Sequence, residues 1–124
     1  MSNSSSESDL RDSLVLRLDG FEGPLDLLLE LARAQKVDLA RISMLALVDQ
    51  YLATIETARV RLELAADWLV MAAWLTWLKS RLLVPSGPEA EEAEEAAGQL
   101  AERLQALEAI RTAAAWLSAH PILG

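Results

Sequence analysis

The segment from Leu64 to Val84 carries apolar side chains on two sides of the helix that its spacing predicts. One row, spaced four and three residues apart, comprises Leu64, Trp68, Met71, Leu75, Leu78 and Leu82. A second row, roughly a quarter-turn away, comprises Val70, Trp74, Trp77 and Arg81. Because a small domain buries only one side of such a helix, the second row is expected either to be wrapped completely or to bind a partner.

The chain is predicted to contain four helices, over about residues 24–35, 43–58, 63–84 and 88–118. Pro24 follows a glycine and suits the first turn of the first helix, and Ser43 can cap the second. A Pro-Ser-Gly-Pro sequence separates the third helix from the fourth.

The other three helices carry one main apolar row each. That of the first helix comprises Leu25, Leu28, Leu29 and Ala32, with Leu27 and Leu31 to its side. That of the second comprises Met44, Leu47, Val48, Tyr51, Leu52 and Ile55. That of the fourth is thinner and comprises Leu100, Leu104, Leu107, Ala114 and Leu117. The fourth helix begins with a run of glutamates, which we interpret as a solvated face, the alternative being a contact for a basic partner.

The N-terminal residues lack a helical pattern. Residues 1–13 are polar and rich in serine, which predicts a disordered lead without a secretory signal. Leu14–Leu18 alternates apolar and other positions, which predicts a short strand or, preferably, an extended arm packed on helices. The uncharged stretch Trp68–Leu78 is too short to span a bilayer.

Composition favours an all-α fold in a chain of 124 residues with 52% hydrophobic content and no cysteine. We expect a disordered lead (1–13), a three-helix domain with its N-terminal arm (14–85) and the acidic helix (86–124). A soluble, cytoplasmic protein without disulfides is expected.

The net charge of −8 is concentrated after residue 84, where the sequence contains seven glutamates and two arginines. No basic patch stands out, so direct binding to nucleic-acid phosphates is not expected. A helix-turn-helix nucleic-acid binder remains an alternative, because short helices joined by a tight loop are compatible with one. The bases that it could expose on the second and third helices are few, namely Arg59, Arg61, Lys79 and Arg81.

No arrangement of residues indicates catalysis, and we expect a non-enzyme without cofactor or metal. The only histidine, His120, lies beside a proline near the end of the chain, and metal sites built on histidine and cysteine are therefore improbable. No glycine-rich phosphate loop is present. Asp67 lies close to the first apolar row, where pairing with an arginine is the simplest expectation.

Several ordered motifs over residues 21–85 resemble segregation and condensation protein A, the bacterial kleisin family. Phe21–Leu31 (FEGPLDLLLEL) resembles the opening signature of that family. Val37–Leu39 resembles the family's "(V/L)D(I/L)" motif, and Asp49–Leu52 resembles its "(D/E)QYL" motif. Ala65–Ala73 resembles "ASEFLVMAA", and Lys79–Pro85 resembles "KSRMLLP". The chain departs from the pattern in having tryptophan at 68, 74 and 77, where smaller residues or phenylalanine are more usual.

The resemblance implies a scaffold in chromosome condensation and segregation. In this family the N-terminal helical domain docks on the coiled-coil neck of an SMC (structural maintenance of chromosomes) ATPase and helps to close a ring that entraps DNA. The segment that follows binds a dimer of segregation and condensation protein B. The protein would contact DNA only indirectly, through the ring. It would not bind a membrane and would be located in the cytoplasm, at the nucleoid. This chain would be an N-terminal fragment that lacks the C-terminal winged helix.

The resemblance also suggests a use for the two rows of the third helix. We expect the row of Leu64 to pack on the first two helices and Trp68 to point inward, although sequence alone does not say which row is buried. The residues expected to contact the SMC neck are Val70, Ala73, Trp74, Trp77 and Arg81. The residues expected to contact the second subunit are Leu100, Leu104 and Leu107. A homodimer in which two tryptophan faces cover each other is the remaining alternative.

Overall fold

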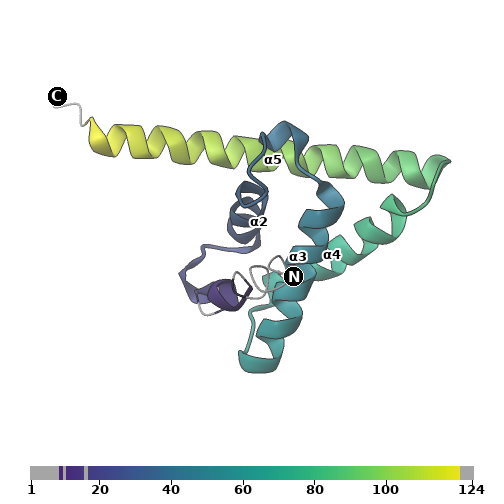
Figure 1. Cartoon of the computed structure of the whole chain (residues 1–124), viewed down its shortest axis with the longest axis horizontal. Helices are drawn as coiled ribbons and strands as arrows, with labels where there is room; N and C mark the ends of the chain where they lie inside the picture. Colours follow the sequence, from purple (N-terminus) through teal and green to yellow (C-terminus); the bar gives the residue numbers. More distant parts are fainter. Residues whose placement is uncertain (1–8, 10, 16, 121–124) are drawn as a thin grey trace.

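The computed structural model describes residue 9, residues 11–15 and residues 17–120, and all regular structure in this part is helical, as the sequence predicts. Its main elements are α2 (Pro24–Arg33), α3 (Met44–Arg61), α4 (Ala66–Leu82) and α5 (Pro88–Ala119), with single turns η1 (Leu18–Gly20) and η2 (Leu39–Arg41). The long helix α5 lies across the ends of the shorter helices, and α4 and α5 diverge from their connection like the arms of a V (Figure 1). Helices lie near the four predicted ranges, but their bounds differ, since α2 ends at Arg33, α3 extends to Arg61 and α4 is shorter at both ends than expected.

The first two long helices are joined by a tight loop whose ends are fixed by side chains. The Ser43 hydroxyl accepts a hydrogen bond from the Ala46 N–H at 3.2 Å, so the predicted N-cap of α3 is confirmed. The Gln35 side chain donates to the Ser43 carbonyl at 3.0 Å and accepts from its N–H at 2.8 Å. This two-point contact closes the loop over residues 36–42.

The N-terminal residues differ from the prediction. The expected strand or extended arm over Leu14–Leu18 is wrong, because residues 11–15 are helical and Leu18 begins η1. Of the expected disordered lead, residues 1–8 and 10 lie outside the described residues, and residues 11–13 are helical.

Helical spacing explains this difference. Leu14 and Leu18 are four residues apart, so an alternating pattern this short also fits one face of a helix. Leu14, Val15 and Leu18 are buried, and Leu14 lines the same small cavity as Leu31 of α2. Arg17 lies 3.9 Å from Glu30 of α2.

The first row of α4 points into the core, which resolves the ambiguity between its two rows. Leu75 and Leu78 are fully buried and Trp68 is 8% exposed, while the rest of that row is partly buried against the same cluster. The O–H of Tyr51 on α3 donates to the Trp68 carbonyl at 3.0 Å, which ties the start of α4 to α3. The inward position of Trp68 is therefore confirmed.

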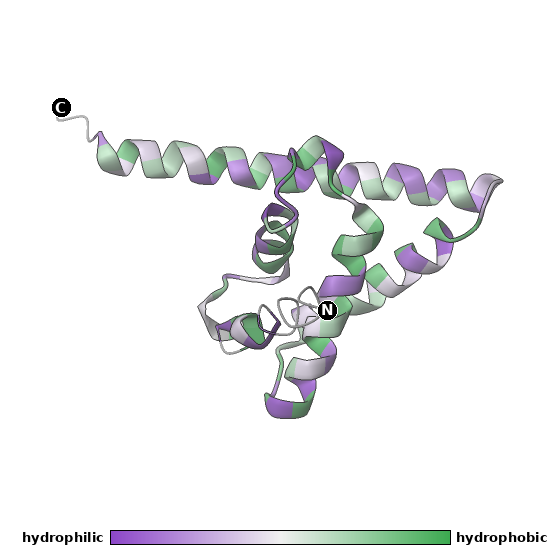
Figure 2. Cartoon of the chain, viewed as in Figure 1, coloured by the Kyte–Doolittle hydropathy of each residue, from purple (hydrophilic) through white to green (hydrophobic). Residues whose placement is uncertain are grey.

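Helix α5 packs against the same core as the shorter helices. Ala93, Leu100 and Leu104 are buried and belong to the cluster that includes α2, α3 and α4. The connection into α5 turns at Gly87, whose φ of 102° is a left-handed conformation that favours glycine. The glutamates near the start of α5 are all exposed and give this half of the helix its hydrophilic colour in Figure 2, as expected for a solvated face.

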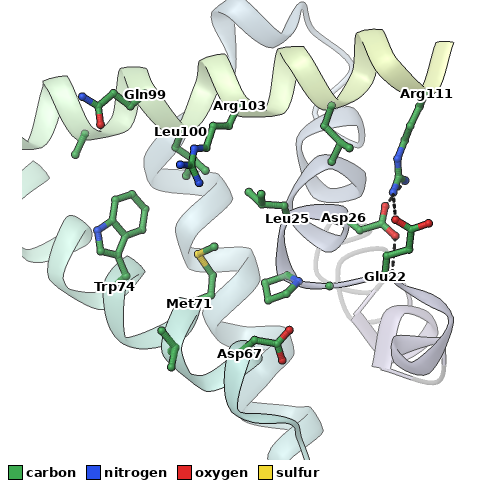
Figure 3. A pocket seen from close by; sticks show the side chains of 15 residues that line it. Glu22, Leu25, Asp26, Asp67, Met71, Trp74, Gln99, Leu100, Arg103 and Arg111 are labelled. Atoms are coloured by element: carbon green, nitrogen blue, oxygen red, sulfur yellow. Dashed lines mark hydrogen bonds and ion pairs between the residues drawn. The ribbon is translucent and has the colours of Figure 1, made fainter. Parts of the chain in front are cut away.

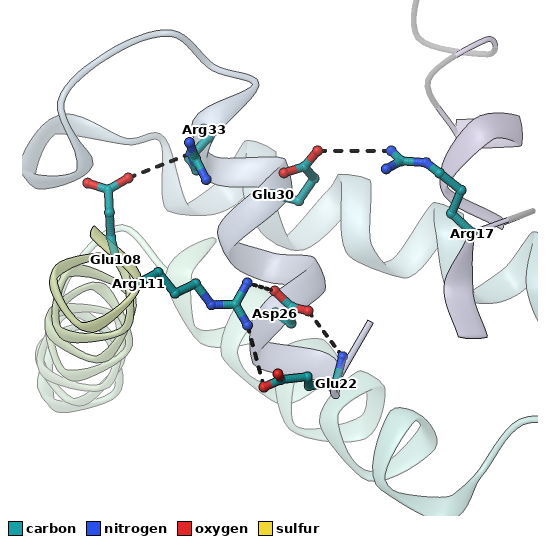
Figure 4. Close-up of polar contacts among 7 residues, drawn as sticks. All are labelled: Arg17, Glu22, Asp26, Glu30, Arg33, Glu108 and Arg111. Carbon is teal, nitrogen blue, oxygen red and sulfur yellow. Dashed lines mark hydrogen bonds and ion pairs between the residues drawn. The ribbon is translucent and has the colours of Figure 1, made fainter. Parts of the chain in front are cut away.

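Ion pairs reinforce the contact between α5 and α2. Arg111 pairs with Asp26 and lies 3.6 Å from Glu22, and Arg33 lies 3.7 Å from Glu108 (Figure 4). Asp26 also accepts the Glu22 backbone N–H at 3.1 Å. Asp26 therefore joins the first turn of α2 both to the preceding loop and to α5.

Candidate docking groove between α4 and α5

The second row of α4 faces α5, and α5 covers only part of it. Toward the end of α4, Trp77 is partly buried against the core, and the Arg81 guanidinium lies 5.5 Å from the centre of its ring. Arg81 also pairs with Glu89 of α5 at 3.0 Å. Toward the start of α4 the two helices have diverged, and Trp74 is 37% and Val70 66% exposed.

These positions refine the expected SMC-facing residues. Val70, Ala73 and Trp74 are exposed, whereas Trp77 is half-buried because its ring lies partly against the core, and contact of these residues with an SMC neck stays a prediction. Arg81 is half-buried beside α5. The sequence did not reveal that α5 covers this end of the row, since the turn at Gly87 sets the direction in which α5 leaves α4.

The divergence of α4 and α5 leaves a groove of about 880 Å³, closed at one end by the start of α2. Figure 3 shows Trp74 and Met71 rising from α4, Leu100 and Arg103 descending from α5, and Leu25 between the helices. The groove is lined by Glu22, Gly23, Pro24, Leu25, Asp26, Asp67, Val70, Met71, Trp74, Ala96, Gln99, Leu100, Arg103, Leu107 and Arg111. It is thus an apolar channel between two helices, with charged side chains at its edges.

The leucines expected to bind a second subunit lie in or against the core, and Leu100 and Leu107 also line this groove. Leu104 is fully buried, Leu100 is nearly so, and Leu107 is partly buried against the core. Binding of a second subunit through them stays a prediction and would require α5 to move. Their spacing of four and three residues is that of a core-facing row, a signal already present in the sequence. Other apolar side chains of α5 are exposed instead, namely Ile110, Trp116 and Leu117.

The charges around these helices are mostly paired within the chain. Of the four bases weighed for nucleic-acid binding, Arg59 pairs with Glu56 at 2.6 Å and Lys79 with Asp49 at 2.7 Å, and Arg81 is paired with α5 as described. The hydrogen bond from Arg59 lowers the pKa of Glu56. This pairing weakens the case for a phosphate-binding surface on α3 and α4.

Among the titratable groups that the structure describes, Tyr51 has a strongly shifted pKa. Burial, with a smaller contribution from Asp67, raises the pKa of Tyr51, whose hydroxyl is already bound to a carbonyl oxygen. No group of histidine and carboxylate side chains in the described ranges is placed to hold a metal ion. Over the same ranges, no helix has both the length and the apolarity needed to cross a bilayer. The groove itself has a mostly apolar lining with charged side chains at its edges.

Comparison with known proteins agrees with the motifs. Residues 31–117 match the family described as segregation and condensation protein ScpA. The chain belongs to this family. The matched range contains α3, α4 and nearly all of α5, and therefore both long walls of the groove.

Relatives named segregation and condensation protein A cover most of the chain. The protein of Xylella fastidiosa (strain 9a5c) is 45% identical over 90% of this chain and 38% of its own length. That of Coxiella burnetii is 42% identical over 91% of the chain and 43% of its own length. That of Streptococcus pyogenes serotype M18 is 38% identical over 78% of the chain and 42% of its own length. The chain thus spans about two fifths of these relatives, and no solved structure matches it.

Proposed function

We propose that this chain is the SMC-docking part of a non-enzymatic kleisin scaffold for chromosome condensation and segregation. Its groove between α4 and α5 would bind the coiled-coil neck of an SMC ATPase, and this contact would help to close a ring that entraps DNA. The observation that carries the proposal is the open end of the groove, where Val70 and Trp74 remain exposed in a chain of this family. The protein would act in the cytoplasm, at the nucleoid.

Physical reasons favour a helical partner at this surface. Val70 and Trp74 are four residues apart, so they lie one above the other on the same face of α4, and a neighbouring helix contacts such a row over successive turns. A partly exposed tryptophan next to apolar surface gains most when a partner excludes the remaining water. A coiled-coil neck offers an apolar helical surface of this kind.

The exposed end of α5 suits a second partner. Trp116 and Leu117 are 55% and 51% exposed, and the last turns of α5 project beyond the other helices (Figure 1). In our proposal this end, rather than the buried Leu104, contacts segregation and condensation protein B. The two partners would then bind at separate places on the chain.

The exposed tryptophans allow a test with two identical substitutions. Trp74→Glu places a charge in the groove, and Trp116→Glu places the same charge on the projecting end of α5. Each variant would be measured by calorimetry against an SMC head-and-neck fragment and against segregation and condensation protein B. We expect Trp74→Glu to lose at least about 2 kcal/mol of SMC binding free energy, since it removes a candidate hot spot, and to retain the second partner. Trp116→Glu should show the reverse pattern.

Folding of both variants is checked by far-UV circular dichroism, because both tryptophans are partly exposed and neither belongs to the core cluster. Trp77→Glu is the less informative variant, since Trp77 packs against the core and its loss would also destabilise the fold. Normal SMC binding by a folded Trp74→Glu variant would place the contact outside the groove. Sedimentation of the chain alone tests the alternative of a homodimer through this face.

A further inference from the structure

The groove is lined by five charged side chains, of which one has no partner within the described part of the chain. Arg111 is paired with Asp26 and with Glu22. Asp67 accepts a backbone N–H at 3.0 Å and lies in the first turn of α4, where the helix dipole stabilises a carboxylate. Arg103 of α5 is the charged side chain of the groove that forms neither an ion pair nor a hydrogen bond with the described residues.

The position of Arg103 matters because it is exposed at the edge of a groove whose lining is mostly apolar. Its side chain extends from α5 into the groove, toward the side where Met71 and Trp74 rise from α4 (Figure 3). While the groove is open, water solvates this guanidinium. A purely apolar partner that covered the groove would remove that water and leave an unpaired charge, which is strongly unfavourable.

The size of the groove fits one face of a helix. A helix about 10–12 Å wide with a pitch of about 5.4 Å encloses roughly 400–600 Å³ per turn. The groove volume of about 880 Å³ therefore accommodates half of a helix over about three turns.

We propose that α5 is the second wall of the SMC-docking site and that Arg103 selects a neck helix carrying a carboxylate opposite it. This inference rests on the proposed function and adds a specificity determinant on α5. Asp and Glu are the side chains that meet the requirement, because a guanidinium binds a carboxylate through two parallel N–H donors. A neck helix with only apolar or basic residues at that point would be rejected.

The test compares Arg103→Glu, Arg103→Met and Arg61→Glu in calorimetric binding to the SMC head-and-neck fragment at low and high salt. Arg61 is exposed near the end of α3, does not line the groove and forms no ion pair among the described residues, so Arg61→Glu reproduces the change in net charge. We expect Arg103→Glu to weaken binding about five- to tenfold at low salt. Arg103→Met should weaken it about two- to threefold, with the difference shrinking at high salt because ions screen exposed charge pairs.

The outcomes separate this inference from the proposed function. If Trp74→Glu abolishes binding and Arg103→Glu binds like Arg61→Glu, the neck contacts α4 without the help of α5, and the role of Arg103 is refuted alone. If the unmodified chain does not bind the SMC fragment, both proposals fail. If the chain does not bind the SMC fragment but forms a homodimer that Trp74→Glu dissociates, the groove binds a second copy of the chain. That result would overturn both proposals.

Discussion

Shortening Leu104 to alanine tests whether α5 belongs to the folded core. Leu104 lies in the middle of α5 and is 0% exposed. Burying a leucine side chain contributes roughly 1.5–3 kcal/mol by transfer from water, and truncation also leaves a cavity. We therefore expect Leu104→Ala to lower the free energy of unfolding by about 3 kcal/mol, within the range of about 2–5 kcal/mol for buried leucines.

The same substitution at Leu117 is the matched control. Leu117 lies on the same helix, is 51% exposed and does not belong to the core cluster. Leu117→Ala is expected to change the free energy of unfolding by less than about 0.5 kcal/mol, since it opens no cavity and alanine is a good helix former.

Urea unfolding followed by far-UV circular dichroism measures both effects. With a slope of about 2 kcal/mol/M, a loss of about 3 kcal/mol moves the Leu104→Ala midpoint down by about 1.5 M. Equal midpoints for Leu104→Ala, Leu117→Ala and the unmodified chain would refute the reasoning. That result would mean that α5 does not pack on the shorter helices in solution, and the groove would lose one of its walls.

Two further predictions concern α3. The pKa of Tyr51 is raised in the folded state, so folding favours the neutral phenol; the stability that it contributes is present below the unfolded pKa of about 10 and is lost as pH rises above it. Tyr51→Phe should therefore lower the free energy of unfolding, measured in urea, by about 1 kcal/mol near neutral pH and by progressively less in alkali. Because Tyr51 is the only tyrosine, tyrosinate absorbance should appear only as the protein unfolds. Ser43→Ala should lower the free energy of unfolding by about 1 kcal/mol and Ser43→Gly by a few tenths, and equal stability of all three chains would show that the cap contributes nothing.

Much of the fold could be predicted from spacing alone. The row of α3 and the first row of α4 have a strict helical period over several turns, and their predicted members are buried or partly buried in the structure. The N-cap of α3 could also be predicted from local sequence, because Ser43 forms its capping hydrogen bond within its own helix. The error at Leu14–Leu18 arose because five residues are too few to distinguish a period of two from one face of a helix.

The site was harder to predict, because it depends on contacts between residues far apart in the chain. That Val70 and Trp74 form one row follows from their spacing. That Trp77 is partly covered while Trp74 remains open depends on the angle at which α5 leaves α4, and no pattern within α4 encodes that angle. The pairing of Asp26 with Arg111, 85 positions away, likewise appears only when α5 lies across α2.

The sequence by itself determined the helices, the family and the presence of two apolar rows on α4, because these depend on the order of side chains along one helix or one motif. Only the tertiary structure decided which row is buried, how far α5 covers the other and which charge in the groove has no partner among the described residues. The physical reason is that burial belongs to a side chain together with its distant neighbours. The same tryptophan is buried or exposed according to whether another helix excludes water from it.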